Sequence, residues 1–248
     1  MPLELLFLGS GTSAGVPMIG CDCDVCTSAD PHDNRTRASI IVRYPDADDP
    51  SYQRQILVDA APDIRIQVTR ERLNHIDALL LTHAHADHIF GIDDLRRFNA
   101  VMKQPIDVHA EPDVIDTLRR MFSYIFEKHN NVNQSFVADL ILMPLTVEAS
   151  FDLHGATWTP LRLMHGRLPI VGFRVDFAGA SLAYCTDVSI IPPESYPLLE
   201  GVDVLVIDAL RYRAHPTHMS VDQALEHVER LKPKQTYFTH IAHDIRHA

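Results

Sequence analysis

Residues 79–88, with the sequence LLLTHAHADH, decide how this chain folds and what chemistry it can carry. The apolar run predicts a strand that leads directly into three histidines and an aspartate. Alternate side chains of an extended segment share a face, so His83, His85 and Asp87 can converge while His88 begins a turn into the next helix. Imidazole and carboxylate groups suit zinc, manganese or iron, and one such hexapeptide can serve two ions. The motif predicts a metal site at the end of a strand.

The composition of the 248 residues is that of a globular protein, with 46% hydrophobic and 22% charged side chains. Twenty-two basic and 33 acidic residues leave a net charge of −11, which argues against a nucleic-acid partner that needs a basic face. No apolar run reaches the roughly 18 residues of a membrane helix, and the N-terminus has no cationic flank typical of a signal peptide. We expect a cytoplasmic protein without a membrane partner.

Short runs rich in Val, Ile and Leu alternate with helical patterns along the chain. Helices are predicted over 62–73, 89–98, 112–128 and 220–231, and Ser220 is a candidate N-cap for the last of them. Loops are predicted over 44–52 and 130–135. The predicted strands are 3–8, 38–43, 55–59, 78–82, 105–109, 157–163, 171–177, 181–185, 202–208 and 236–239. No break in composition divides this pattern, which predicts one α/β domain spanning residues 1–248.

Three further candidate ligands follow predicted strands, as the first motif does. His165 follows Leu161-Arg162-Leu163-Met164, Asp187 follows 182–186 (LAYCT), and His240 follows 236–239 (TYFT). Strand tips at one edge of a sheet are a natural place for a site, because the scaffold is rigid and the loops can vary. Each residue also has a structural alternative: a turn residue at His165, a helix N-cap at Asp187, and a competitor for His240 in His243.

The motif over 83–88 matches the HxHxDH signature of the metallo-β-lactamase superfamily, which the chain resembles. This resemblance implies a four-layer αββα sandwich with two catalytic metal ions. His83, His85 and His165 would then hold the first ion, and Asp87, His88 and His240 the second. Asp187 would bridge the two ions.

A cluster of three cysteines, Cys21, Cys23 and Cys26, narrows the resemblance. Three thiolates need a fourth ligand to close a tetrahedral zinc site, and His243, three residues after His240, can supply it. This arrangement resembles the phosphoribosyl cyclic phosphodiesterase (PhnP-like) branch, in which a structural zinc ties the first loop to the C-terminus. A closed site has no open position for catalysis. The fourth cysteine, Cys185, is expected to be a buried core thiol.

Two more site residues follow from the resemblance. Asp59, in the strand-plus-aspartate segment 58–63, is expected to orient metal-binding histidines and not to bind metal itself. His218 is the better match for a histidine that faces the substrate phosphate, with His215 as the alternative. An imidazole suits proton donation to a leaving oxygen near neutral pH.

The function that these expectations favour is hydrolysis of a small or cyclic phosphodiester by a hydroxide that bridges two zinc or manganese ions, with one further structural zinc. His218 and Asp187 are the expected catalytic residues. A tRNA 3′-processing-type nuclease and a lactone or thioester hydrolase use the same kind of metal site and stay open. A non-catalytic, metal-stabilised binding scaffold is the alternative from another class. The expected partner is the small-molecule substrate, and the family resemblance adds a homodimer.

Overall fold

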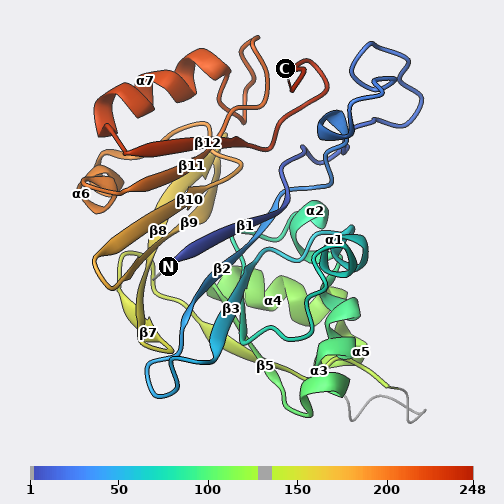
Figure 1. Ribbon diagram of the computed structural model, residues 1–248, viewed down its shortest axis with the longest axis vertical. Helices are drawn as coiled ribbons and strands as arrows, with labels where there is room; N and C mark the ends of the chain where they lie inside the picture. Colours follow the sequence, from blue (N-terminus) through green and yellow to red (C-terminus); the bar gives the residue numbers. More distant parts are fainter. Residues whose placement is uncertain (1–2, 128–135, 248) are drawn as a thin grey trace. The chain divides into compact units, whose positions relative to one another are not determined.

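The computed structural model describes residues 3–127 and 136–247, so the loop predicted over 130–135 lies outside the described residues. Two six-stranded mixed sheets contain the strands β1–β6 and β7–β12, each in chain order along its sheet (Figure 1). The chain divides into a β1–β6 unit, residues 4–8 and 39–146, and a β7–β12 unit, residues 1–3, 9–38 and 147–248. Whether they form the single domain predicted above stays a prediction.

In the β1–β6 unit, strands β3 to β6 run parallel, and β2 pairs antiparallel with β3. Parallel strands end at a common sheet edge, so β3 and β4 deliver the residues that follow them to the same place. Asp59 follows β3, and the histidine motif follows β4. The strands are β1 (Glu4–Gly9), β2 (Ser39–Pro45), β3 (Gln53–Val58), β4 (Ala78–Leu80), β5 (Ile106–Ala110) and β6 (Leu140–Pro144).

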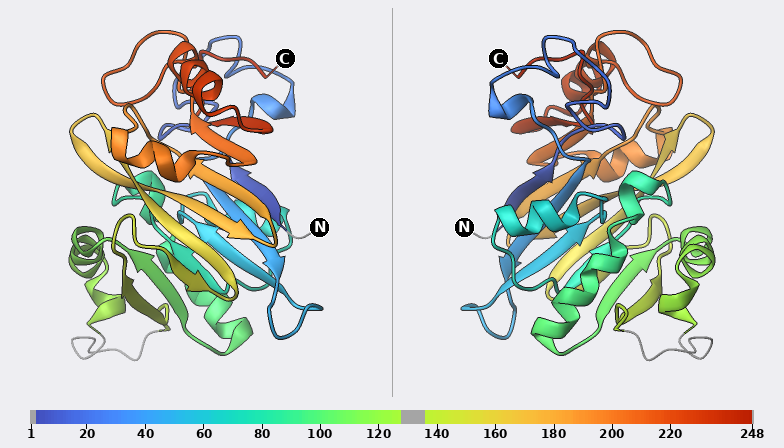
Figure 2. Two further views of the ribbon diagram at one scale, coloured as in Figure 1. Left: turned by 90° about the vertical axis from the view of Figure 1, so that its left-hand side faces the viewer. Right: turned by 90° about the vertical axis from the view of Figure 1, so that its right-hand side faces the viewer.

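Helices pack against this sheet through one apolar core (Figure 2). Leu57 and Leu79 from the strands share this core with Ile64, Leu95 and Leu118 from the helical segments. Burying such side chains supplies most of the favourable free energy of folding. The helical segments are α1 (Ile64–Arg70), α2 (Ala86–Ile89), η2 (Ile92–Leu95), α3 (Arg96–Met102), α4 (Pro112–Met121) and α5 (Ser123–Phe126).

In the β7–β12 unit, β8, β9 and β10 form an antiparallel meander, and β11 and β12 then continue parallel to β10. Strands β8, β10, β11 and β12 therefore all point the same way and end at one sheet edge. The strands are β7 (Phe151–Leu153), β8 (Ala156–His165), β9 (Leu168–Phe177), β10 (Ala180–Cys185), β11 (Val204–Asp208) and β12 (Gln235–Thr239). Helices α6 (Tyr196–Leu199) and α7 (Val221–Leu231) join the core of this unit.

Two details of the β7–β12 unit match the sequence pattern. Ser220 caps α7 in a capping box, since its hydroxyl accepts from the Gln223 N–H and the Gln223 side chain accepts from the Ser220 N–H. Cys185 is fully buried in the core, and this burial raises the pKa of its thiol to about 12. Within the described chain, no helix is long and apolar enough to cross a membrane.

Candidate metal centres

The histidine motif forms a tight cluster in the β1–β6 unit. The ring centroid of His83 lies 4.5 Å from that of His85 and 4.2 Å from that of His88. The Asp87 carboxylate adds an oxygen 3.3 Å from Nε2 of His88. His83 and His88 are buried, while His85 is exposed. The motif thus brings its four candidate ligands together after β4, but the predicted extended segment ends at His85, and Asp87 lies with His88 in the helix α2.

Asp59 holds this cluster in place from the end of β3. Its carboxylate accepts hydrogen bonds from the N–H and hydroxyl of Thr82, and its Oδ2 lies 2.7 Å from Nδ1 of His88. Pairing at Nδ1 directs Nε2 of His88 to the ligand role. Complete burial raises the pKa of Asp59, against the opposing influence of His88 and Thr82. The geometry is that of a carboxylate that orients a candidate metal ligand.

The edge of the β7–β12 unit gathers a second set of candidate ligands. Nδ1 of His165 lies 2.9 Å from the carbonyl oxygen of Asp187 and 2.8 Å from that of Thr217. Carbonyl oxygens only accept, so Nδ1 carries the proton and Nε2 is the atom that can bind a cation. Nε2 of His240 lies 3.2 Å from the Asp187 carboxylate. Donor atoms of His165, Asp187 and His218 all lie within 4.8 Å of one another.

His218 has a distinct environment within this set. Its Nδ1 lies 2.6 Å from Oδ2 of Asp208, and its ring stacks on His240 with centroids 4.5 Å apart. Asp208 ends β11 and is fully buried, which raises the pKa of its carboxyl well above the usual value, a shift that the nearby Asp187 reinforces. His215 is half-buried and its Nδ1 lies near the Thr217 hydroxyl instead. A buried carboxylate pairs with His218.

Asp208 was missed in the sequence analysis, although the sequence carries a signal for it. The apolar run 204–207 ends in this aspartate in the same way that the runs before His165 and His240 end in histidines. An acidic residue that closes a buried parallel strand needs a partner, because burying a carboxyl without one is costly. Applying the strand-tip argument to every predicted strand would have identified it.

Backbone conformation sets three of these residues apart. Asp59, Asp187 and His240 are buried and have left-handed φ values of 63°, 56° and 57°. Residues other than glycine pay about 1 kcal/mol or more for this conformation, and it persists where the surrounding structure enforces it. Such strain concentrates at functional sites.

The three cysteines meet His243 as the sequence analysis expects. Nδ1 of His243 lies 3.2, 3.4 and 3.5 Å from the sulfur atoms of Cys21, Cys23 and Cys26. A zinc tetrahedron with ordinary bond lengths has a nitrogen–sulfur edge of about 3.6 Å, so these residues fit a zinc ion. A hydrogen bond from the Cys26 N–H lowers the pKa of Cys23 to about 6, which favours the thiolate that binds zinc.

Main-chain pairing explains why residues more than 200 positions apart meet here. The Thr12 N–H donates to the carbonyl of Ile241, and the Ile241 N–H donates to the carbonyl of Ser10. These bonds join the cysteine loop to the segment that follows β12. The four ligands close the coordination sphere, so this site fits a structural role.

Comparison with known proteins agrees with this fold. The sequence profile of the β-lactamase superfamily domain matches residues 54–241. The chain belongs to this superfamily, and its histidine–aspartate clusters have the composition of a metal site. The predicted fold class is thereby confirmed.

Individual relatives indicate which branch of the superfamily the chain is similar to. A crystal structure described as a new diphosphatase from the PhnP family is 40% identical, covers 100% of this chain and 89% of its own, and superposes with a TM-score of 0.87. This agrees with the predicted branch. An octanoyltransferase of Porphyromonas gingivalis is 36% identical over 97% of this chain, which spans only 46% of that protein. Coenzyme PQQ synthesis protein B of Methylobacterium nodulans is 28% identical over 83% of this chain and 72% of its own length.

Proposed function

We propose that this protein is a metal-dependent hydrolase of a small phosphate compound, acting on a phosphodiester, linear or cyclic, or on a diphosphate linkage. The observation that carries the proposal is the pair of Asp208 and His218 beside the candidate ligands His165, Asp187 and His240. A buried imidazole held by a carboxylate is suited to proton transfer. The similarity to a PhnP-family diphosphatase supports phosphorus as the centre that is attacked.

The proposed cofactors are two divalent ions, zinc or manganese, in addition to one structural zinc. The proposed ligands of the catalytic ions are His83, His85, Asp87 and His88 in the β1–β6 unit, and His165, Asp187 and His240 in the β7–β12 unit. Hard carboxylate oxygens and borderline imidazole nitrogens fit both metals. When bound, such ions supply Lewis acidity toward phosphoryl oxygens and activate water.

The chain's own residues orient the candidate metal ligands and supply the proton for the leaving group. Asp59 fixes the ring of His88, and the carbonyls of Asp187 and Thr217 fix the ring of His165. With Nδ1 of His218 donating to Asp208, the proton that can move sits on Nε2. The contact with Asp208 fixes the ring so that Nε2 can donate this proton to the leaving oxygen. His218 is therefore the proposed general acid, in preference to His215.

The competing functions have less support from the sequence and the structure. A tRNA-processing nuclease needs a cationic surface for its RNA, and the chain carries a net charge of −11. Lactone or thioester hydrolysis does not require the Asp208–His218 pair. A binding scaffold has no need to keep every candidate ligand. The octanoyltransferase name belongs to a protein about twice as long as the matching region, so it adds no acyl transfer to the proposal.

The test is hydrolysis by protein reconstituted separately with zinc and with manganese. Bis(p-nitrophenyl) phosphate, p-nitrophenyl phosphate, a nucleoside diphosphate and a simple lactone would be compared. We expect metal-dependent turnover of the diester or the diphosphate, and little of the monoester. Turnover of the lactone alone would assign the protein to acyl hydrolysis and remove the role of His218.

A further inference from the structure

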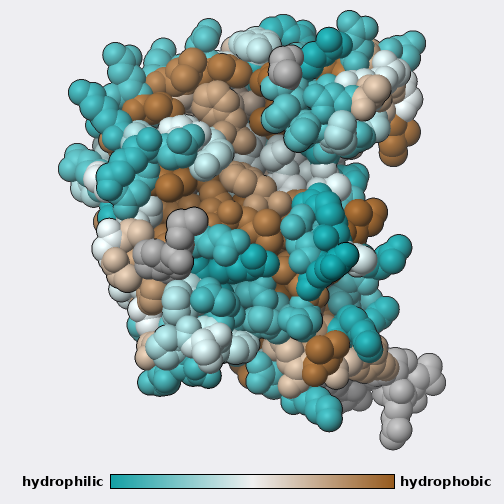
Figure 3. Space-filling model, in the orientation of Figure 1, coloured by the Kyte–Doolittle hydropathy of each residue, from teal (hydrophilic) through white to brown (hydrophobic). Residues whose placement is uncertain are grey.

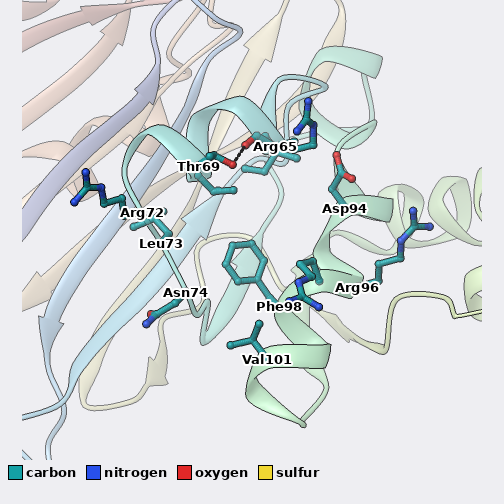
Figure 4. A pocket seen from close by; sticks show the side chains of 12 residues that line it. Arg65, Thr69, Arg72, Leu73, Asn74, Asp94, Arg96, Phe98 and Val101 are labelled. Carbon is teal, nitrogen blue, oxygen red and sulfur yellow. Dashed lines mark hydrogen bonds between the residues drawn. The ribbon is translucent and has the colours of Figure 1, made fainter.

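A cavity of about 610 Å³ lies between α1 and the η2–α3 segment, but its surroundings do not form a binding site. Hydrophilic side chains cover α1 (Figure 3). Three of the arginines beside the cavity, Arg65, Arg72 and Arg96, point apart from one another (Figure 4). Guanidinium groups that diverge in this way do not bind one anion together. The buried hydroxyl groups beside the candidate metal ligands give a firmer basis for an inference.

Two threonines, Thr82 and Thr239, each precede a candidate ligand near the end of a strand. Thr82 comes shortly after β4 and precedes His83, and Thr239 ends β12 and precedes His240. All four residues are buried. A buried hydroxyl costs free energy unless it makes a hydrogen bond, so the partner of each hydroxyl indicates whether it contributes to the site.

The Thr82 hydroxyl lies between Asp59 and His83 in the β1–β6 unit. Its oxygen is 2.9 Å from Oδ2 of Asp59 and 3.0 Å from Nδ1 of His83. The Thr82 N–H donates to Oδ1 of the same carboxylate at 2.9 Å. Because the main chain and the side chain of Thr82 both bind one carboxylate, the hydroxyl is held in place beside His83.

The direction of these hydrogen bonds follows from the single proton of the hydroxyl. The carboxylate of Asp59 accepts, so the Thr82 hydroxyl donates its proton there. Toward His83 the hydroxyl oxygen can then only accept, which requires that Nδ1 of His83 carries the ring proton. In a neutral imidazole with this proton, Nε2 has the lone pair that binds a cation. The contact therefore favours one of the two tautomers of His83.

We propose that Thr82 is a positioning residue, whose hydroxyl passes the orienting effect of Asp59 on to His83 and selects the tautomer that binds metal through Nε2. One buried carboxylate then orients two candidate ligands, His88 directly and His83 through Thr82. Hydrogen bonds to metal ligands typically change metal affinity by about 10- to 100-fold. The inference rests on the proposed metal-dependent function, since His83 is a proposed ligand of a catalytic ion.

Thr239 supplies a matched control in the β7–β12 unit. Its hydroxyl oxygen is buried and has no hydrogen-bond partner among the described residues, although His240 follows it directly. Thr239→Val therefore makes the same chemical change as Thr82→Val, from hydroxyl to methyl beside a candidate ligand, without removing a hydrogen bond. A difference between the two variants reports the hydrogen bond and not the change in polarity.

The first measurement is the affinity of the protein for zinc and for manganese, by competition with a chelator of known affinity. The zinc content of the cysteine site is the internal reference. We expect Thr82→Val to weaken the binding of one catalytic ion by about 10- to 100-fold, whereas Thr82→Ser, which keeps the hydroxyl, and Thr239→Val should bind it as the unmodified protein does. Unchanged affinity in Thr82→Val, no rescue by Thr82→Ser, or an equal loss in Thr239→Val would overturn the inference and leave the proposed function standing. An unmodified protein that binds only the zinc of the cysteine site would overturn both.

A second measurement reads the tautomer directly. NMR of the histidine ring nitrogens in the zinc-loaded protein should show a proton on Nδ1 of His83, protected from exchange with water by its hydrogen bond. In Thr82→Val this proton should exchange faster, while the Nδ1 proton of His88, which is bound to Asp59, should keep its protection. Metal coordination through Nδ1 of His83 in the unmodified protein, or unchanged exchange in the variant, would contradict the assignment.

Discussion

The sharpest prediction concerns His218→Ala and the chemistry of the leaving group. A general acid contributes about 10²- to 10⁴-fold to the rate, which is roughly 3–5 kcal/mol of barrier. That contribution is needed only when the leaving oxygen is basic. We expect kcat for an alkyl phosphodiester to fall within this range, whereas bis(p-nitrophenyl) phosphate, with its stabilised leaving anion, should lose less than about tenfold.

The measurement is kcat for both substrates, together with metal content by elemental analysis. His218 lies near candidate ligands, so the metal content decides whether it acts on the proton or on the metal. An unchanged metal content with a loss selective for the alkyl substrate supports the general acid. Equal losses on the two substrates, or the loss of a metal ion, would refute the reasoning.

Asp208→Asn tests the positioning role in the same assay. The 2.6 Å contact with Nδ1 of His218 fixes the ring, and removing such a supporting carboxylate typically costs about 10- to 100-fold in activity. In the double variant Asp208→Asn/His218→Ala, the loss of kcat should be no greater than in His218→Ala alone, because the Asp208 carboxylate acts only through the His218 imidazole. Losses that multiply would show that Asp208 has a separate role.

Three further predictions concern stability and the structural metal. Cys26→Ser should remove one zinc per chain, measured by elemental analysis, and lower Tm; an unchanged zinc content would contradict the cysteine site. Gly91→Ala should cost about 3 kcal/mol in urea unfolding, because the added methyl would lie 2.2 Å from the Ala61 carbonyl oxygen; an unchanged midpoint would contradict this contact. A hydrogen bond from Lys234 is the main cause of the lowered pKa of Asp203 in the folded protein. The ionised Asp203 carboxylate therefore stabilises the fold at pH values above the pKa that it has in the unfolded chain. This stabilisation is lost as the pH falls through the lower pKa of the folded protein. Asp203→Asn should therefore lower Tm at pH 7 but not at about pH 2, and an equal loss at both values would refute the ionic origin.

Much of the fold and of the site was predictable because both depend on apolar runs that end in polar residues. Each of the ten predicted strands corresponds to an observed strand. Residues 46–52 of the loop predicted over 44–52 lie between β2 and β3, while Tyr44 and Pro45 still belong to β2. The short β7 and the edge strand β6 were missed. Edge strands pair on one side only, and their sequence pattern is correspondingly weak. The helix predicted over 112–128 is interrupted at Phe122, whose φ of −116° and ψ of 42° are not helical.

What the sequence pattern could not provide is the backbone conformation of the site. Local propensity favours glycine or asparagine at left-handed positions, and nothing in a periodicity of apolar residues marks Asp59, Asp187 and His240 as exceptions. The other non-glycine residues with positive φ in the described chain, Arg72 among them, lie at exposed or half-buried turns.

The contrast between these two groups carries a functional argument. At an exposed turn, the conformational free energy that a left-handed residue costs is small, and a small change elsewhere in the chain can recover it. At a buried strand end, glycine would remove the backbone strain. A strained residue other than glycine therefore persists there only if its side chain contributes more to function than the strain costs in stability. The carboxylates of Asp59 and Asp187 and the imidazole of His240 are the groups that the proposed chemistry requires. Strain, burial and ligand chemistry therefore coincide at the same three residues, as expected for a chain that sacrifices stability to hold metal ions.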